Sequence, residues 1–129
     1  MSKVVLRSEE SGGVVSAIEL SSSPGFKGPP LHHHGFDEAF YVLEGELTFQ
    51  LRDEVFTRGA GGLAFAPRNI PHTYANHSDA PARALLVCTP AGFERYFARR
   101  QAERDGIDPP AWALQGYPET TVVGPQIGM

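Results

Sequence analysis

Four side chains of this chain offer donor atoms that transition metals bind, and they fall in two short segments. His32, His34 and Glu38 lie in PPLHHHGFDEAFYVLEGEL, and His72 follows in GGLAFAPRNIPHTYAN. Successive side chains point to opposite faces of a strand, so His32, His34 and Glu38 share a face if that strand is continuous, whereas His33 points away. Three imidazoles and one carboxylate form a mixed nitrogen and oxygen set that suits iron, manganese, cobalt, nickel, copper or zinc.

This donor set predicts a catalytic rather than a structural metal site. An octahedral ion held by four protein ligands keeps two positions for water, dioxygen or substrate, and such openness is typical of catalysis. A carboxylate that detaches from the ion lies beside the substrate, so we predict that Glu38 also acts as a general base. Two alternatives stay open: the histidines could lie on a solvated loop, and Glu38 could form an ion pair with Arg68 or Arg83.

The elements that must position these residues are short strands. Apolar runs alternate with glycine- and proline-containing turns, a pattern that indicates a β-sandwich or barrel. In residues 46–51, Leu47, Phe49 and Leu51 alternate with polar residues, as in a strand with one wet face. The predicted strands are residues 4–6, 14–20, 38–43, 46–51, 55–57, 63–66, 72–76 and 83–89. We therefore predict an all-β fold for residues 1–90.

The period changes after the last predicted strand. In TPAGFERYFARRQAERDG, the aromatic residues Phe93, Tyr96 and Phe97 recur at helical spacing, which predicts an amphipathic helix whose aromatic side covers the sheet. Thr89 is the expected cap at its start and Gly106 marks its end. The sequence beyond predicts one short helical turn near residue 112, and leaves open whether this tail closes the barrel, exchanges with a partner or hangs free.

Length and composition set further limits. The 129 residues predict a single domain, 1–129, with a barrel core at about 14–90 and a helix and tail at 91–129. A net charge of −4 without a basic stripe argues against a nucleic-acid partner. A single cysteine, Cys88, excludes an intrachain disulfide and fits a reducing compartment. We find no signal peptide and no apolar stretch long enough to span a membrane, so we expect a cytoplasmic location.

The spacing of the histidine segments resembles the two motifs of the cupins. The first motif is matched by His32, His34, Glu38 and Gly45, and the second by Gly61, Pro67, His72 and Asn76. Two positions depart from the pattern: Phe26 stands where the first motif opens with glycine, and Asn69 replaces the glycine of the second. The latter position needs positive φ, which Asn tolerates well, so the turn is expected to form.

The resemblance implies a fold and an activity. The fold is a double-sheet jelly-roll β-barrel, to which the predicted C-terminal helix adds, and the implied metal ligands are His32, His34, Glu38 and His72. The segment TPAGFERYF is similar to small bacterial cupins related to quercetin 2,3-dioxygenase. The resemblance therefore predicts a metal-dependent dioxygenase for a small organic substrate, of aromatic or flavonol-like type, with iron or manganese among the candidate ions.

Two other functions remain open alongside the dioxygenase. One is a non-redox, metal-dependent isomerase or lyase, and the other is a module that binds or senses a small molecule without turnover. Phe40 and Tyr74 share strand parity with nearby ligands and are the predicted substrate contacts. Since small cupins associate through sheet edges, and the N-terminal strand offers such an edge, a homodimer is expected.

Overall fold

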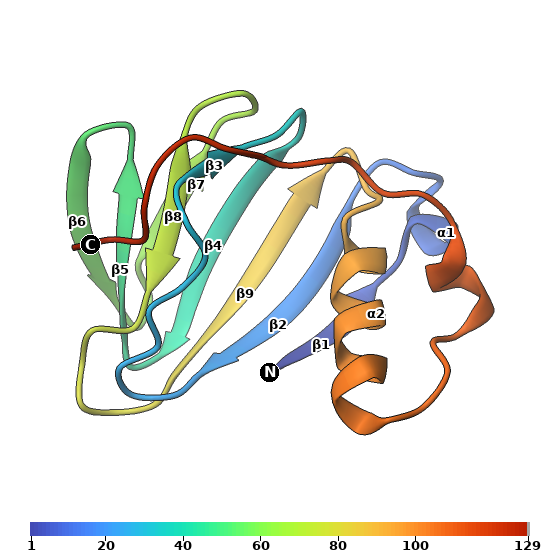
Figure 1. Ribbon diagram of the computed structural model, residues 1–129, viewed down its shortest axis with the longest axis horizontal. Coiled ribbons are helices and arrows are strands. Elements are labelled where there is room, and N and C mark those ends of the chain that lie inside the picture. The colour runs from blue at the N-terminus through green and yellow to red at the C-terminus, as the bar shows by residue number, and fades with distance from the viewer. Residues whose placement is uncertain (129) are drawn as a thin grey trace.

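Two five-stranded antiparallel sheets form a jelly roll in the computed structural model, which describes residues 1–128 (Figure 1). The first sheet has the order β1 (Ser2–Leu6), β2 (Ser16–Ser22), β9 (Ala82–Thr89), β4 (Asp37–Glu44) and β7 (Leu63–Ala66). The second has the order β10 (Thr121–Val122), β3 (His32–His33), β8 (His72–Ala75), β5 (Glu46–Leu51) and β6 (Glu54–Gly59). The all-β prediction is confirmed, and no predicted strand end is off by more than two residues.

The core lies between the sheets. Side chains alternate between buried and partly exposed along β9, because one face of this central strand packs inward. The inward faces contribute a cluster of apolar side chains, including Ile18, Phe40, Val42, Leu47 and Leu86. Burial of this apolar surface is the main stabilising term for a sandwich of this size.

The predicted helix is present as α2 (Glu94–Asp105), which packs against β1 and β2 at one side of the sandwich (Figure 1). Its predicted start was wrong: Thr89 is the last residue of β9 and pairs with Asp37, so it cannot cap a helix. Gly92, with φ 137°, makes the turn into α2 instead. The predicted end is confirmed, since Gly106 adopts φ 67° as a left-handed cap.

Two further helical segments flank α2. The short helix α1 (Ser8–Ser11), which the sequence did not predict, lies between β1 and β2 and ends at Gly12 with φ 66°. The predicted turn near residue 112 is confirmed as the 3₁₀ helix η1 (Ala111–Leu114). No helix within residues 1–128 is long and apolar enough to cross a membrane.

The histidine segment is not one continuous strand, so the condition for His32, His34 and Glu38 to share a strand face is not met. His32 and His33 form β3 in the second sheet, the chain turns at residues 34–36, and Asp37 begins β4 in the first sheet. The segment therefore crosses the sandwich. His32 and Glu38 approach each other because they lie on facing sheets, with His34 in the turn that joins them, and shared strand parity is not the reason.

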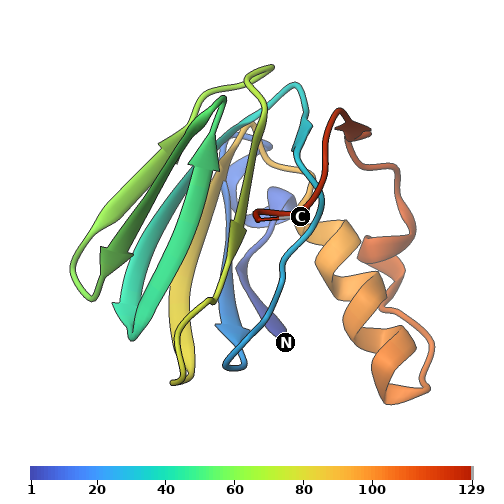
Figure 2. The same ribbon diagram turned by 60° about the vertical axis from the view of Figure 1, so that its left-hand side comes forward.

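The C-terminal tail returns to its own barrel. Thr121 and Val122 of β10 pair with β3, so the tail adds an edge strand to the second sheet (Figure 2). Past β10, the N–H of Val123 donates to the Leu31 carbonyl at 2.8 Å, and the N–H of Leu31 donates to the Pro125 carbonyl at 3.0 Å. Of the three possibilities left open for the tail, the structure shows the one in which it closes the barrel.

Candidate metal centre

The four predicted ligands come together between the two sheets. His32 on β3 and His72 on β8 are direct cross-strand partners, Glu38 on β4 faces them, and His34 lies in the turn between β3 and β4. One donor atom from each side chain lies within 4.8 Å of all the others. His34, Glu38 and His72 are buried, whereas His32 is half-buried.

Backbone carbonyls orient all three imidazole rings. Nδ1 of His32 lies 2.7 Å from the Pro30 carbonyl oxygen. Nδ1 of His34 is 3.0 Å from the Phe36 carbonyl and Nδ1 of His72 is 2.9 Å from the Ile70 carbonyl. A carbonyl only accepts hydrogen bonds, so each Nδ1 carries the proton in the neutral ring. Each Nε2 then has its lone pair free for a ligand.

The remaining donor atoms converge in a way that requires a positive charge. Nε2 of His34 and Nε2 of His72 both lie 2.7 Å from Oε1 of Glu38. Two ring lone pairs and a carboxylate oxygen at such distances repel one another unless protons or a cation lie among them. A divalent transition metal ion satisfies all of these atoms at once, so the donor set fits a bound metal.

The pKa values of Glu38, His72 and His32 depend on the balance between burial and the contacts within the cluster. Burial by itself raises the pKa of the Glu38 carboxyl, but hydrogen bonds from His34 and His72 outweigh burial and hold its pKa at about 2. Burial lowers the pKa of His72, but its hydrogen bond to Glu38 and the charge of Glu38 raise that pKa above its ordinary value. Burial prevails at His32 and lowers its pKa. Glu38 therefore stays ionised at neutral pH.

The ion-pair alternative for Glu38 is wrong. Arg68 instead pairs with Asp37, its Nη2 lying 3.0 Å from Oδ2. Arg83 pairs with two other carboxylates, Glu19 at 2.9 Å and Glu44 at 3.0 Å. The Glu38 carboxylate instead contacts the rings of His34 and His72.

The second-motif turn supports the cluster from outside. Asn69 has φ 65°, as its place in the motif predicted, and its N–H donates to the carbonyl of His34 at 2.7 Å. The ring of His34 stacks on Phe36, with centroids 3.6 Å apart and planes inclined by 4°. Backbone and aromatic contacts therefore fix the position of a ligand that lies outside any strand.

A cavity of about 620 Å³ opens beside the cluster, of a size that accommodates a small organic molecule. His32, Glu38 and His72 form part of its wall, and so do the two predicted substrate contacts, Phe40 and Tyr74. Whether Phe40 and Tyr74 touch a substrate stays a prediction. Two other strand aromatics lie elsewhere: Phe49 is in the core and Phe65 is exposed on the outer face of β7.

The sequence interpretation missed most of the remaining wall. The aromatic side of α2 contributes Phe93, Tyr96 and Phe97, and the tail contributes Tyr117. The helical spacing placed Phe93, Tyr96 and Phe97 on one side and predicted that they pack on the sheet; Phe93 immediately precedes α2, and all three pack on the core and line the cavity as well. Their aromatic character was the signal available in the sequence. The other two histidines, His33 and His77, and the buried thiol of Cys88 do not join the cluster.

Comparison with known proteins decides the family. The family model described as Cupin domain matches residues 20–88, which is more than half of the chain. This chain belongs to the cupin family. Its cluster of His32, His34, Glu38 and His72 lies on the two cupin motifs identified in the sequence. The search of curated proteins found no match.

Solved cupin structures are similar over the barrel. A protein from Thermus thermophilus is 31% identical, with a TM-score of 0.61 over 70% of this chain and 82% of the other. The polyketide cyclase RemF from Streptomyces resistomycificus is 26% identical, with a TM-score of 0.61 over 68% of this chain and 63% of that one. A sugar phosphate isomerase of the cupin superfamily from Silicibacter pomeroyi is also 26% identical, with a TM-score of 0.58 over 68% of this chain and 59% of the other.

Proposed function

We propose that this cupin is a mononuclear metal-dependent enzyme that acts on a small, ring-bearing organic molecule. His32, His34, Glu38 and His72 hold the ion in this proposal. The observation that carries it is the convergence of three oriented ring nitrogens and one ionised carboxylate beside a cavity lined with aromatic side chains. When bound, the ion supplies Lewis acidity and, if it is redox-active, a route for electrons.

Glu38 is the proposed base. Its Oε1 faces both histidines, whereas its Oε2 accepts no hydrogen bond from the described residues. An oxygen free of such partners can take a proton from a substrate hydroxyl or from an acidic C–H beside it. The low pKa of Glu38 makes it a weak base in the metal-free protein, so proton transfer relies on a substrate whose own acidity is increased in the site.

The cavity wall orients the substrate. Phe40 and Tyr74 both line the cavity, with ring centroids 5.3 Å apart and planes inclined by 44°, so they present aromatic surface to a ring-bearing substrate. Burial raises the pKa of the Tyr74 hydroxyl, with a further contribution from the charge of Glu38. Tyr74 therefore remains a neutral hydrogen-bond donor at any physiological pH.

The first candidate reaction is dioxygenation of a phenolic or enolic ring compound. Its support is the resemblance of the motifs and of the TPAGFERYF segment to quercetinase-like cupins. The second candidate is a non-redox cyclisation or isomerisation, supported by the names of two solved relatives, a cyclase and an isomerase. Both candidates use the same ligands and the same proton transfer to Glu38.

Metal analysis and oxygen uptake test the proposal. Protein purified without a chelating resin is analysed for bound elements, and we expect about one transition metal ion per chain. Oxygen consumption is then followed with a panel of phenols, flavonols and β-diketones, and product formation is followed in parallel under nitrogen. Uptake that depends on substrate supports dioxygenation, whereas full turnover under nitrogen supports the non-redox reaction. Binding without any product over long incubation would leave a binding protein and refute the enzyme proposal.

A further inference from the structure

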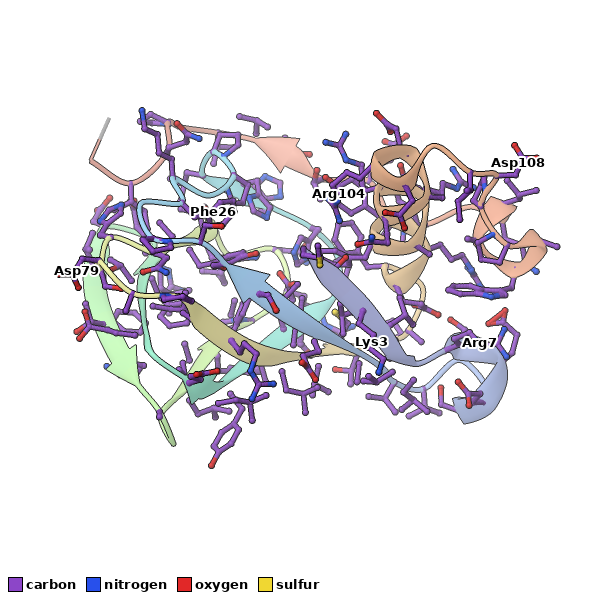
Figure 3. The ribbon with its side chains drawn as sticks, turned by 90° about the horizontal axis from the view of Figure 1, so that it is seen from below. Lys3, Arg7, Phe26, Asp79, Arg104 and Asp108 are labelled. Carbon is purple, nitrogen blue, oxygen red and sulfur yellow. The ribbon has the colours of Figure 1, made fainter. Side chains whose placement is uncertain are left out.

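Two arginines line the cavity on the α2 side, remote in sequence from the metal ligands. Arg100 and Arg104 are four residues apart on α2, so they lie on the same side of this helix. Tyr96, which also lines the cavity, lies one turn before them. The guanidinium carbon of Arg100 is 6.0 Å from the centre of the Tyr96 ring. Figure 3 shows Arg104 on α2 and Phe26 on the loop after β2, both of which line the cavity.

Of the arginines described, these two are the ones that line the cavity, and neither has an anionic partner. Arg7, Arg68 and Arg83 form ion pairs with carboxylates, and Arg95 and Arg99 donate to backbone carbonyls near η1. Within residues 1–128, neither Arg100 nor Arg104 forms an ion pair, and the one polar contact of Arg104 is with Gln101.

Arg100 and Arg104 carry like charges on the exposed surface of α2, and Arg104 lies in the last turn, where a helix favours a positive charge. Like charges at positions i and i+4 of a helix repel each other and weaken it. The protein as a whole carries a net charge of −4, so this pair is a local positive site on an acidic molecule. Two guanidinium groups at the wall of a cavity attract and orient an anion.

We infer that the cavity takes an amphipathic organic acid: its ring system lies among the aromatic side chains near the metal cluster, and its anionic group binds Arg100 and Arg104. Apolar side chains, including Leu20, Leu86 and Phe97, also line the cavity. The anionic group is a carboxylate or a phosphate, since the guanidinium fork matches both. This inference refines the substrate class of the proposed enzyme and rests on that proposed function for its catalytic meaning, although binding can be tested without turnover.

The test uses two fluorescent dyes with the same rings and different charge. Anilinonaphthalenesulfonate carries one negative charge, and phenylnaphthylamine is its neutral counterpart. Both are titrated into the wild type and the variant Arg100→Gln/Arg104→Gln. The matched control is Lys3→Gln/Arg52→Gln, which removes the same charge at two exposed positions outside the cavity.

We expect the double arginine variant to bind the sulfonate about tenfold more weakly, as the loss of two partly exposed charge-assisted contacts predicts. Its affinity for the neutral dye should stay within about twofold, which also reports an intact cavity, and the control should match the wild type for both dyes. Displacement by naphthoate and by naphthyl phosphate, with naphthol as the neutral comparison, then identifies the preferred anion. Equal weakening of both dyes, no weakening of either, or no displacement by either acid would overturn the inference.

Zinc-loaded and metal-free protein are titrated side by side. If zinc does not bind stoichiometrically but the arginine variant still discriminates between the dyes, the proposed metalloenzyme fails and the acid-binding cavity stands. If zinc binds and the discrimination is absent, the enzyme proposal stands and the arginine pair is an ordinary solvated helix side.

Discussion

Each histidine of the cluster is oriented by a carbonyl two residues away from it in the chain: Pro30 for His32, Phe36 for His34 and Ile70 for His72. The tautomer of every ring is therefore set by local backbone geometry, before any ion binds. Ligands oriented in this way lose little conformational freedom on binding, so each one contributes strongly to affinity.

Removal of the His72 side chain tests whether an oriented histidine contributes strongly to metal affinity. We expect His72→Ala to reduce metal affinity by at least about a hundredfold, since even partners outside the ligand shell are worth roughly ten- to a hundredfold. The fold should survive, because the core is built from apolar side chains. Metal stoichiometry and the far-ultraviolet circular dichroism spectrum measure the two effects. His77→Ala, at an exposed position, is the control, and full metal occupancy in His72→Ala would contradict the assignment.

Metal affinity should also decrease as pH decreases. The pKa of His72 is raised above 6.5 in the metal-free protein, and His72 must lose its proton to bind an ion. Affinity is therefore expected to fall as pH decreases through this raised pKa, with protons released on binding. Glu38, with a pKa of about 2, stays ionised and adds no slope there. Calorimetry in buffers of different ionisation enthalpy measures the released protons, and pH-independent affinity would be the contrary result.

The same shifts predict the stability of the metal-free protein. The raised pKa of His72 means that the folded state holds this proton more tightly, so its stabilising contribution is present below pH 6.5 and is lost as pH rises through the raised value. The contribution of Glu38 is present above about pH 4.5 and is lost as pH falls toward 2. Thermal unfolding of metal-free protein across this range should show a maximum between the two limits, and a monotonic rise to alkaline pH would contradict it.

At the scale of elements, the position of α2 depends on one buried carboxylate. Glu94, the first residue of α2, is fully buried and accepts hydrogen bonds from the N–H and the hydroxyl of Ser8, both at 2.6 Å, and from the N–H of Gly92 at 2.7 Å. These bonds fasten α2 to α1, and α2 in turn forms one wall of the cavity. Burial opposes ionisation of Glu94, but these bonds keep its pKa below the ordinary value.

Loss of this carboxylate should therefore affect both stability and ligand binding. We expect Glu94→Ala to lower the free energy of unfolding by about 3 kcal/mol, because it leaves three buried donors without an acceptor. Urea unfolding measures the change, with Glu103→Ala at an exposed position of the same helix as the control. Dye binding in the cavity should weaken in Glu94→Ala as well. An unfolding free energy within about 0.5 kcal/mol of wild type would show that α2 is held by other contacts.

The elements also show which features a sequence can reveal. Alternation of apolar and polar residues predicts the strands, Gly106 predicts the end of α2, and motif spacing predicts the metal ligands. Each of these signals lies within a short stretch of sequence or at a fixed spacing along it. One contact that docks α2 joins Ser8 to Glu94, residues 86 positions apart, and no local pattern reports it. For that reason the roles of Tyr96, Arg100 and Arg104 in the cavity wall could not be predicted, although the helix itself was.

At the scale of the whole molecule, the expected homodimer remains to be tested. The sequence predicts a contact at the edge of the N-terminal strand, and β1 is an edge strand of the first sheet, against which α2 also packs. A different surface is exposed and apolar: Tyr41 on β4 pairs with Leu63 on β7, and Phe65 lies beside them, all with more than a third of their surface in solvent. Contiguous exposed apolar surface of this kind marks interaction sites.

We therefore predict a homodimer that buries this outer face of the first sheet. Light scattering at micromolar concentration should give the mass of two chains. Phe65→Glu should shift the protein to the mass of one chain, because a charge buried without a partner costs several kcal/mol. Leu114→Glu, which changes an exposed apolar residue on η1, should leave the dimer intact. A wild-type protein with the mass of one chain would refute the dimer, and a dimer that persists in Phe65→Glu would place its contact elsewhere, with the β1 edge as the next surface to test.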